Sequence, residues 1–447
     1  MPTTLLDLPD DILHMIGEAT TTGKDTFGEA LYFCDIRDLF RLAQVNQRLR
    51  SVAERPLWKW MSIDSALEDP FAKWRIAKLT ESPELWARIV GMSMGTTDTN
   101  AGTLFASFAL TLAVNLAFLS YEVVVAGSPP DLSNSIPLAI TNCLRKLPLK
   151  ALTLGDGMPI YTFADNTFSL LHDLPYLSQV EISGDVLAAH QLETERQGVL
   201  SHCEFSGGGP AAAKFFARAV HYSEWVSIWD DGPEILEPLW TSEILDNLEA
   251  SWCETSPDKE SPFAVKKLIL DYEVFFPDSP EITPRIFRLL GQLPLVQLEL
   301  HDGSDFMWLQ GWSSNIVLST ITTLLLAAPS EAESTEVVDR EPAPMSFLES
   351  PNTLESLFRF LGCFPNLKVL DLPEWMLATG LMDVAGWSPC ELAARRPHLQ
   401  SLLVILDTTQ ITRLKIWSRT DNAHFYVLAT RDDGSRGRWT WEAWHRL

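Results

Sequence analysis

The sequence predicts an α/β fold in which a small helical N-terminal part precedes a long, irregular array of helices and parallel strands. Three observations lead to this prediction. Apolar residues recur with helical spacing before residue 60, a short strand pattern then recurs along the chain, and helical spacing returns between those strands. The chain has 447 residues, 46% of them hydrophobic and 21% charged, which is enough apolar material for two or more folded parts.

The sequence pattern of the N-terminal part predicts two helices. In LPDDILHMIGE, residues 8–18, a proline and two aspartates suit the first turn, and isoleucines and a leucine form one apolar face. The polar stretch EATTTGKDTFGEA is expected to be a loop. The stretch DIRDLFRLAQVNQRLRSVAERP then predicts one helix that begins near Asp35 or Asp38 and is ended by Pro56. So short a segment buries only part of its apolar surface alone, so the rest is expected to face the next domain or a partner.

Three pieces of this segment occur in the order of a known motif: LPDDILxxI, then DLxxLAxVNxxL, then LW. Together they resemble the F-box, a small helical module that docks the Skp adaptor of a Skp–cullin–F-box ubiquitin ligase, and the adaptor in turn joins a cullin. The resemblance covers residues 5–60. It implies adaptor contacts at the motif positions, which are Leu8, Pro9, Ile12, Leu13, Ile16, Leu39, Leu42, Val45, Leu49 and Trp58.

Two features depart from the F-box pattern. The link between the two halves, residues 19–35, is longer than usual, and Leu49 stands where many members carry Trp. An insertion of this kind can loop out at little cost, because the entropy of closing a loop rises only logarithmically with its length.

The body of the chain repeats the pattern L-x-x-L-x-L, with Ile, Val or an aromatic residue allowed. It begins at residues 116, 149, 177, 200, 265, 295, 321, 367, 399 and 411. This is the strand pattern of a leucine-rich repeat. Segments with helical spacing precede several of these strands. A proline separates helix from strand at Pro148, Pro175, Pro294, Pro365 and Pro397. A doubly wound sheet is the alternative, but it does not require this repeated pattern.

These patterns divide the chain into parts. We expect an F-box at 4–62, a helical linker at 63–100, a degenerate leucine-rich-repeat solenoid at 101–410 and a β-rich cap at 411–447. Within the solenoid, residues 206–264 predict a degenerate repeat plus a loop, and the acidic segment 329–346 predicts a disordered insertion. The uncharged stretch 101–120 is long enough to cross a membrane, but a buried helix followed by a repeat strand also explains it.

Enzymatic, cofactor and metal chemistry find little support. The stretch GMSMG, residues 91–95, matches the nucleophile elbow of hydrolases, but the flanks do not predict the strand and helix that an elbow around Ser93 requires. Histidines and the six cysteines are scattered, so neither a metal site nor a disulfide framework is predicted. We therefore expect a non-catalytic protein without cofactors, in the cytoplasm or nucleus.

The net charge of the chain limits the classes of partner that we expect. The chain has 59 Asp and Glu against 34 Lys and Arg, a net charge of −25, which disfavours nucleic acids and favours basic proteins. In each repeat strand, the residue between the last two apolar positions is expected to face the concave side of the sheet. Four of those ten residues are acidic: Glu181, Glu204, Glu299 and Asp371. They either form a binding surface for a basic partner or are solvated charges on an exposed face.

Taken together, the sequence predicts the substrate-recognition subunit of a Skp–cullin–F-box ubiquitin ligase. Its F-box would dock the Skp adaptor and its repeats would bind a protein substrate. The alternative is a leucine-rich-repeat interaction scaffold without a role in ubiquitylation. No membrane association is expected in either case.

Overall fold

The structure is a computed structural model of the chain. The residues that it describes are 8–19, 23–24, 30–31, 37–64, 70–97, 100–124, 134–154, 161–163, 167–182, 199–206, 209–229, 241–253, 263–271, 282–301, 309, 316–327, 351–373, 406–420, 423–431 and 439–446. The chain forms two compact units, which we call unit 1, Met1–Leu200, and unit 2, Ser201–Leu447. Each is described by itself.

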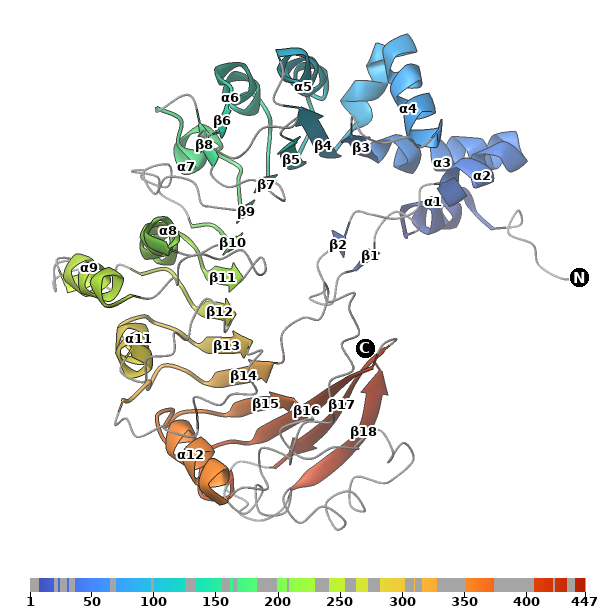
Figure 1. Cartoon of the computed structure of the whole chain (residues 1–447). Coiled ribbons are helices and arrows are strands. Elements are labelled where there is room, and N and C mark those ends of the chain that lie inside the picture. The colour runs from blue at the N-terminus through green and yellow to red at the C-terminus, as the bar shows by residue number, and fades with distance from the viewer. Residues whose placement is uncertain are drawn as a thin grey trace, which may run out of the picture. The chain divides into compact units, whose positions relative to one another are not determined.

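Unit 1 begins with helices and continues as alternating strands and helices (Figure 1). Its elements are α1 (Asp10–Ala19), β1 (Gly23–Lys24), β2 (Ala30–Leu31), α2 (Arg37–Val45), α3 (Gln47–Lys59), β3 (Trp60–Asp64), α4 (Pro70–Glu81), the 3₁₀ helix η2 (Pro83–Arg88), β4 (Gly91–Thr97), α5 (Asn100–Leu112), β5 (Phe118–Val124), β6 (Asn134–Ile136), α6 (Leu138–Leu144), β7 (Ala151–Leu154), β8 (Tyr161–Phe163), α7 (Leu170–Asp173) and β9 (Gln179–Ile182).

Unit 2 repeats the alternation and ends in strands. Its elements are β10 (His202–Ser206), α8 (Gly209–Tyr222), β11 (Trp225–Trp229), α9 (Ser242–Cys253), β12 (Lys267–Asp271), α11 (Ile282–Leu290), β13 (Gln297–His301), β14 (Thr323–Ala327), α12 (Pro351–Leu361), β15 (Val369–Pro373), β16 (Arg413–Thr420), β17 (Ala423–Thr430) and β18 (Thr440–Arg446). An α/β fold is therefore present in both units, as predicted.

The second predicted N-terminal helix is in fact two helices. Asn46 adopts an extended backbone between α2 and α3, and its side-chain oxygen accepts a hydrogen bond from the Leu49 amide, so it is the N-cap of α3. The prediction that Pro56 ends the helix is also wrong, because α3 continues to Lys59 with Pro56 inside it. The cap explains the first error. An asparagine side chain hydrogen-bonds to free backbone amides at a helix start, and this favours a new helix over continuation of the old one.

The polar segment between α1 and α2 contains regular structure. β1 and β2 pair antiparallel, with Gly23 opposite Leu31 and Lys24 opposite Ala30. A plain loop was expected here. The antiparallel pairing of β1 and β2 brings residues 23 and 31 of this segment opposite each other.

The parallel sheet of unit 1 begins before the predicted solenoid. Its strands lie in the order β3-β4-β5-β7-β9, and each neighbouring pair is parallel. The helical linker predicted at 63–100 therefore needs correction, because this interval contains β4 as well as α4 and η2. The prediction missed β3 and β4 because Met61, Met92 and Met94 stand at apolar positions where only Leu, Ile, Val or an aromatic residue was allowed.

A glycine makes the first three strands of this sheet fit together. Trp60, Gly91 and Phe118 lie in register on adjacent strands. The Trp60 indole lies across Gly91, where a Cβ would come within 1.5 Å of the ring, and reaches Phe118 at a centroid distance of 5.4 Å. Gly91 thus lets one aromatic ring span three strands.

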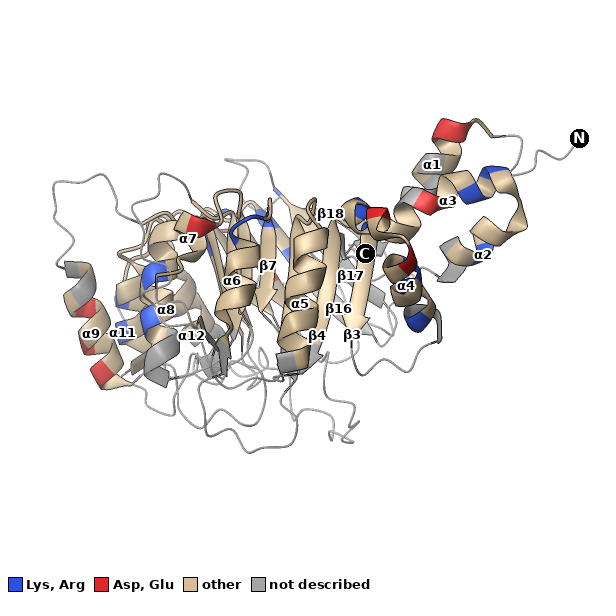
Figure 2. Cartoon of the chain, turned by 90° about the horizontal axis from the view of Figure 1, so that it is seen from above, with Lys and Arg blue, Asp and Glu red and all other residues tan. Residues whose placement is uncertain are grey.

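The uncharged stretch 101–120 forms helix α5 and then strand β5, as the repeat interpretation predicted. Helix α5 is not wholly buried, however. Leu104, Phe108 and the following Val114 are 71%, 57% and 56% exposed, and Figure 2 shows no charged residue on this helix. None of the helices that the structure describes is long and apolar enough to span a membrane.

In unit 2 a parallel sheet ends in antiparallel strands. β10 to β16 are parallel neighbours in chain order, and β17 and β18 then continue antiparallel. The predicted β-rich end is confirmed. Residues 206–264 were predicted as a degenerate repeat plus a loop; their described part contains α8, β11 and α9. The predicted strand at 399 and the disordered insertion at 329–346 lie outside the described residues.

One hydrogen-bond pattern joins successive repeats. The carbonyl oxygen of the residue before a strand accepts two amides from the next repeat: Lys150 accepts from Ser178 and Gln179, and Lys368 from Thr412 and Arg413. Between sheet and helices, a row of buried apolar residues in register fills the core of unit 2. Its members include Val226, Leu268, Leu298, Leu324, Leu370 and Leu414. Repeated burial of one position per strand is the feature that the leucine pattern predicts.

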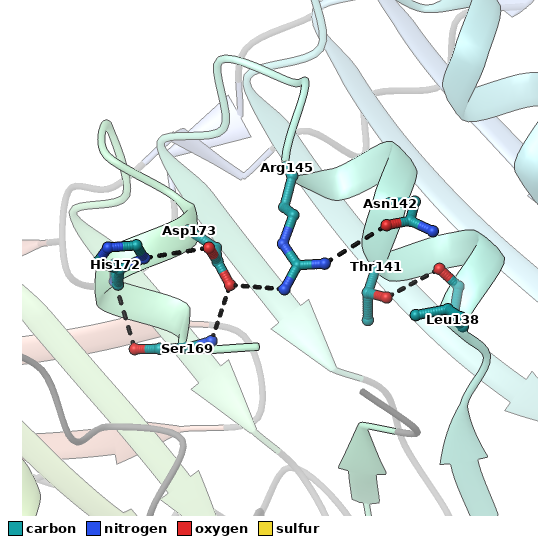
Figure 3. Close-up of polar contacts among 7 residues, drawn as sticks. All are labelled: Leu138, Thr141, Asn142, Arg145, Ser169, His172 and Asp173. Carbon is teal, nitrogen blue, oxygen red and sulfur yellow. Dashed lines mark hydrogen bonds and ion pairs between the residues drawn. The ribbon is translucent and has the colours of Figure 1, made fainter. Parts of the chain in front are cut away.

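Polar contacts also join neighbouring helices within the helical layer of each unit. In unit 1, Arg145 at the end of α6 donates to Asp173 of α7 at 3.1 Å, and Asp173 also accepts from the Ser169 amide at 3.0 Å (Figure 3). Burial alone would raise the pKa of Asp173, but these hydrogen bonds, with that of His172, lower it overall. In unit 2, Arg285 of α11 pairs with Asp246 and Glu249 of α9.

Candidate functional site

The N-terminal helices of unit 1 present apolar side chains to solvent. On α1, Ile12 and Met15 are 41% and 66% exposed, one turn apart, and Pro9 directly before the helix is exposed as well. Val45 at the end of α2 is 65% exposed. We use the name N-terminal apolar surface for this set of exposed apolar residues from two helices: Pro9, Ile12, Met15 and Val45. A short helix that leaves such residues uncovered has apolar area available for a partner.

The other side of these helices forms a small core. Leu13, Leu49 and Val52 are buried together, and Leu8 and Leu42 pack against them half-buried. Leu13 projects from α1 next to the exposed Ile12, because adjacent helical residues point in directions about 100° apart. Trp58 is only 5% exposed, so it belongs to the core as well.

The ten motif positions therefore serve different roles. Leu13, Leu49 and Trp58 are buried, Leu8 and Leu42 are half-buried, and Pro9, Ile12 and Val45 are exposed. The side chains of Ile16 and Leu39 lie outside the described part. Met15 was not among the predicted positions, although its spacing of three residues from Ile12 places both on one side of α1.

Arg48 fixes α1 against α3. Its guanidinium donates to the Asp10 carboxylate at 2.8 Å and to the Leu8 carbonyl at 2.7 Å. The ion pair is exposed, so it contributes little to stability. Its geometric effect is to hold the first turn of α1, which carries Pro9 and Ile12, in one orientation.

A buried arginine lies at the point where helix α3 joins the sheet of unit 1. Arg75 of α4 donates to the carbonyls of Leu57 and Trp60 at the junction of α3 and β3, and its guanidinium lies 5.6 Å from the centre of the Trp58 ring. Burial lowers the pKa of Arg75 to about 9. These contacts satisfy two carbonyls at the helix end, so α3 runs into β3 without a loop.

The geometry of Ser93 excludes the nucleophile elbow. Ser93 lies inside β4, in register with Ser62 of β3 and Ser120 of β5. An elbow requires the serine at a sharp turn from a strand into a helix. Within the described residues, moreover, no group of three His, Cys, Asp or Glu side chains could hold a metal ion.

A second candidate site lies on the sheet of unit 2. On β10 to β16, residues in register with Glu299, and their neighbours two positions along each strand, point away from the helices because side chains alternate along a strand. We call this the helix-distal face. It brings Glu204, Glu299 and Asp371 onto one row, through the register that links β10 to β15. Glu181 lies in unit 1, where Thr153 donates to it at 2.9 Å.

Two of the three acidic residues on the helix-distal face are buried rather than solvated, and the third, Glu204, is half-buried. Glu299 and Asp371 are only 5% and 8% exposed, whereas Glu181 on β9 is exposed. Glu299 contacts His301 at 2.8 Å and lies 3.9 Å from the Lys267 ammonium. Lys415 lies 4.0 Å from Asp371. The sequence left open a binding surface for a basic partner or solvated charges; the structure adds Lys267 and Lys415 beside the acids.

Aromatic side chains complete this cluster. The Trp225 ring stacks on His202 at a centroid distance of 4.1 Å, and the Lys267 ammonium lies 3.7 Å from the ring centre. Trp229 meets His301 edge to face at 4.9 Å. Burial, and then the charge of Lys267, lower the pKa of His202 to about 4, so this imidazole is neutral at pH 7. The sequence indicated the acids but not these partners.

Burial has the opposite effect on Asp371. It raises the pKa of this carboxyl to about 6, and Glu299 adds to the rise, while Lys415 and Arg413 lower the pKa in part. The carboxylate is thus less well compensated than an ordinary surface aspartate.

In comparisons with known proteins, no protein-family model matches the chain, and no curated protein sequence matches it either.

Proposed function

We propose that the chain is a substrate-recognition subunit of a Skp–cullin–F-box ubiquitin ligase, in which α1, α2 and α3 form an F-box-like module that docks the Skp adaptor. The observation that carries the proposal is the N-terminal apolar surface. Three of the positions matched to the motif, Pro9, Ile12 and Val45, are exposed while others of the same motif form the core behind them. A motif that divides into core and exposed apolar residues suits a docking module better than a simple cap.

The repeat units support the second half of the proposal. Helices lie against one face of the parallel strands, and we assign a protein substrate to the opposite face. The adaptor and cullin would bring that substrate to the ubiquitin-transfer machinery. Such a subunit needs no catalytic residues of its own. Its place of action would be the cytoplasm or the nucleus.

The test is capture of the purified Skp adaptor by the full chain and by single variants. Ile12→Asp and Val45→Asp place a charge on the N-terminal apolar surface without entering the core, so each is expected to weaken capture at least about tenfold, the effect of about 1.4 kcal/mol. Leu104→Asp, an exposed apolar residue on α5 of the same unit, is the matched control and should bind like wild type.

The alternative is an interaction scaffold whose N-terminal helices only cap the sheet of unit 1. It predicts no adaptor capture by the wild-type chain. Equal capture by wild type and both surface variants would also reject the proposed docking surface.

A further inference from the structure

The helix-distal face of unit 2 holds buried polar atoms without hydrogen-bond partners. Among the described residues, these are the indole nitrogens of Trp225 and Trp229, Nδ1 of His301 and Oδ1 of Asp371. An unsatisfied buried polar atom costs about 1–3 kcal/mol, and native structures keep few of them. Four of the seven such atoms among the described residues lie on this one face, across strands β11 to β15, which makes it the candidate binding face.

The four atoms present a defined pattern of donors and acceptors. The two indoles can only donate. Nε2 of His301 lies 2.8 Å from Oε1 of Glu299; in the neutral tautomer that donates this hydrogen bond, Nδ1 is an acceptor. Oδ1 of the ionised Asp371 accepts as well. An occupant must therefore offer both acceptors and donors, as a polypeptide backbone does.

The spacing of the atoms requires an extended occupant. Trp225 and Trp229 lie on β11, His301 on β13 and Asp371 on β15. Neighbouring strands are about 4.8 Å apart, so β11 and β15 are separated by about 19 Å. About six extended residues cover that distance.

The charge at the β15 end favours a cation. The nearest ammonium, that of Lys415, lies 4.0 Å from the other oxygen of Asp371, the outer limit of an ion pair. Hydrogen bonds between ionised partners are roughly twice as strong as neutral ones, so an arginine side chain would compensate Asp371 better than an amide. The net charge of −25 also attracts a basic segment over longer distances.

We propose that this face binds an extended segment of a partner protein, with an arginine side chain on Asp371 and main-chain carbonyls on the indoles of Trp225 and Trp229. It deepens the substrate-receptor proposal by naming the class of substrate segment, and rests on that proposal only in calling the partner a substrate. Binding to the face can be measured without the adaptor, so either idea can fail alone.

The test uses the acetylated, amidated heptapeptide GAARAAG as a probe of the full chain labelled with ¹⁵N-tryptophan. The indole signals of Trp225 and Trp229 are assigned with Trp225→Phe and Trp229→Phe. Both signals should shift saturably with GAARAAG, and Asp371→Asn should weaken binding about tenfold or more, because a charge-assisted hydrogen bond is lost. Glu181→Gln, an exposed acid in unit 1, is the matched control and should leave the affinity unchanged.

Two comparison peptides decide between occupants. GAAQAAG and GAAEAAG should bind at least about tenfold more weakly than GAARAAG, by the same loss of a charge-assisted bond. Equal or tighter binding of the glutamate peptide would reveal an anion site built on Lys267 and the indoles, and would overturn the proposal. The absence of any saturable shift would mean that ordered water alone satisfies these atoms, which also overturns it.

The pH dependence supplies an independent readout. The charged groups that face Asp371 are Lys415 and Arg413 on β16 and Glu299 on β13, and the pKa of Asp371 in this setting is about 6. GAARAAG binding should therefore strengthen as the pH rises from 5 to 7.5, because the carboxyl must ionise to pair with arginine. An affinity that is flat over this range in the wild type contradicts the assignment to Asp371.

Discussion

At the scale of single residues, Asp371 shows how little a residue type reveals about its surroundings. The strand pattern placed this acid on the face away from the helices, and the register of β15 confirms that position. It did not indicate burial, because that depends on neighbours from other strands, such as Lys415 and Glu299. A position follows from periodicity, whereas an electrostatic environment requires the assembled sheet.

The raised pKa of Asp371 predicts a pH-dependent stability. Its pKa is about 3.8 when unfolded and about 6 when folded, mainly because burial disfavours the charge. The folded state therefore binds the proton more tightly, so this group stabilises the fold below about pH 4, and the contribution disappears as the pH rises through 6. Two pKa units correspond to about 3 kcal/mol.

Asp371→Asn removes this titration. Urea unfolding at pH 4.5 and 7.5 should show the variant gaining about 2 kcal/mol on the wild type between the two values. A difference in unfolding free energy that does not change with pH would show that Asp371 is ordinary in the folded state.

At the scale of elements, Gly91 sets how β3, β4 and β5 pack. The Trp60 ring occupies the space where a side chain at Gly91 would lie. Gly91→Ala should destabilise the fold by about 1–3 kcal/mol, the range for overpacking, measured as the free energy of urea unfolding. In a Trp60→Leu background the same change should cost clearly less, because the ring is gone. Equal costs in both backgrounds would mean that the ring is not the obstacle.

Elements with the plain leucine pattern could be predicted from the sequence, and others could not. Nine of the ten predicted repeat strands are strands of the structure, and the tenth, at 399, lies outside the described residues. β3 and β4 were missed because Met61, Met92 and Met94 stand at pattern positions, where Met was not allowed, and β11 because Ser223 stands at the first position of its pattern. The break at Asn46 was missed because the helical spacing continues across it, and only the local cap shows the interruption.

The candidate sites follow the same division. The motif marked α1 and α2 as a functional region, but packing decides which of its residues remain exposed, and that needs the positions of Leu49 and Val52 on α3. On unit 2, the acids were foreseen and the tryptophans and histidines were not, because those residues lie two positions away on strands whose register the sequence does not give.

At the scale of the whole molecule, the chain has a helical module, α1 to α3, at the start of unit 1, and repeating helices and strands in both units. The module leaves apolar residues exposed, and unit 2 carries a buried polar cluster with unsatisfied atoms. The first feature suits a constant adaptor and the second a variable partner. The central proposal is that the N-terminal helices bind the adaptor and the repeats bind the protein substrate.

Amide hydrogen exchange of the full chain with and without purified Skp adaptor tests it most directly. The account predicts slower exchange on adaptor binding in peptides that cover Asp10–Ala19 and Arg37–Val45, with no change in Ser201–Leu447. Unchanged exchange in both N-terminal helices at saturating adaptor, or protection confined to Ser201–Leu447, would contradict it.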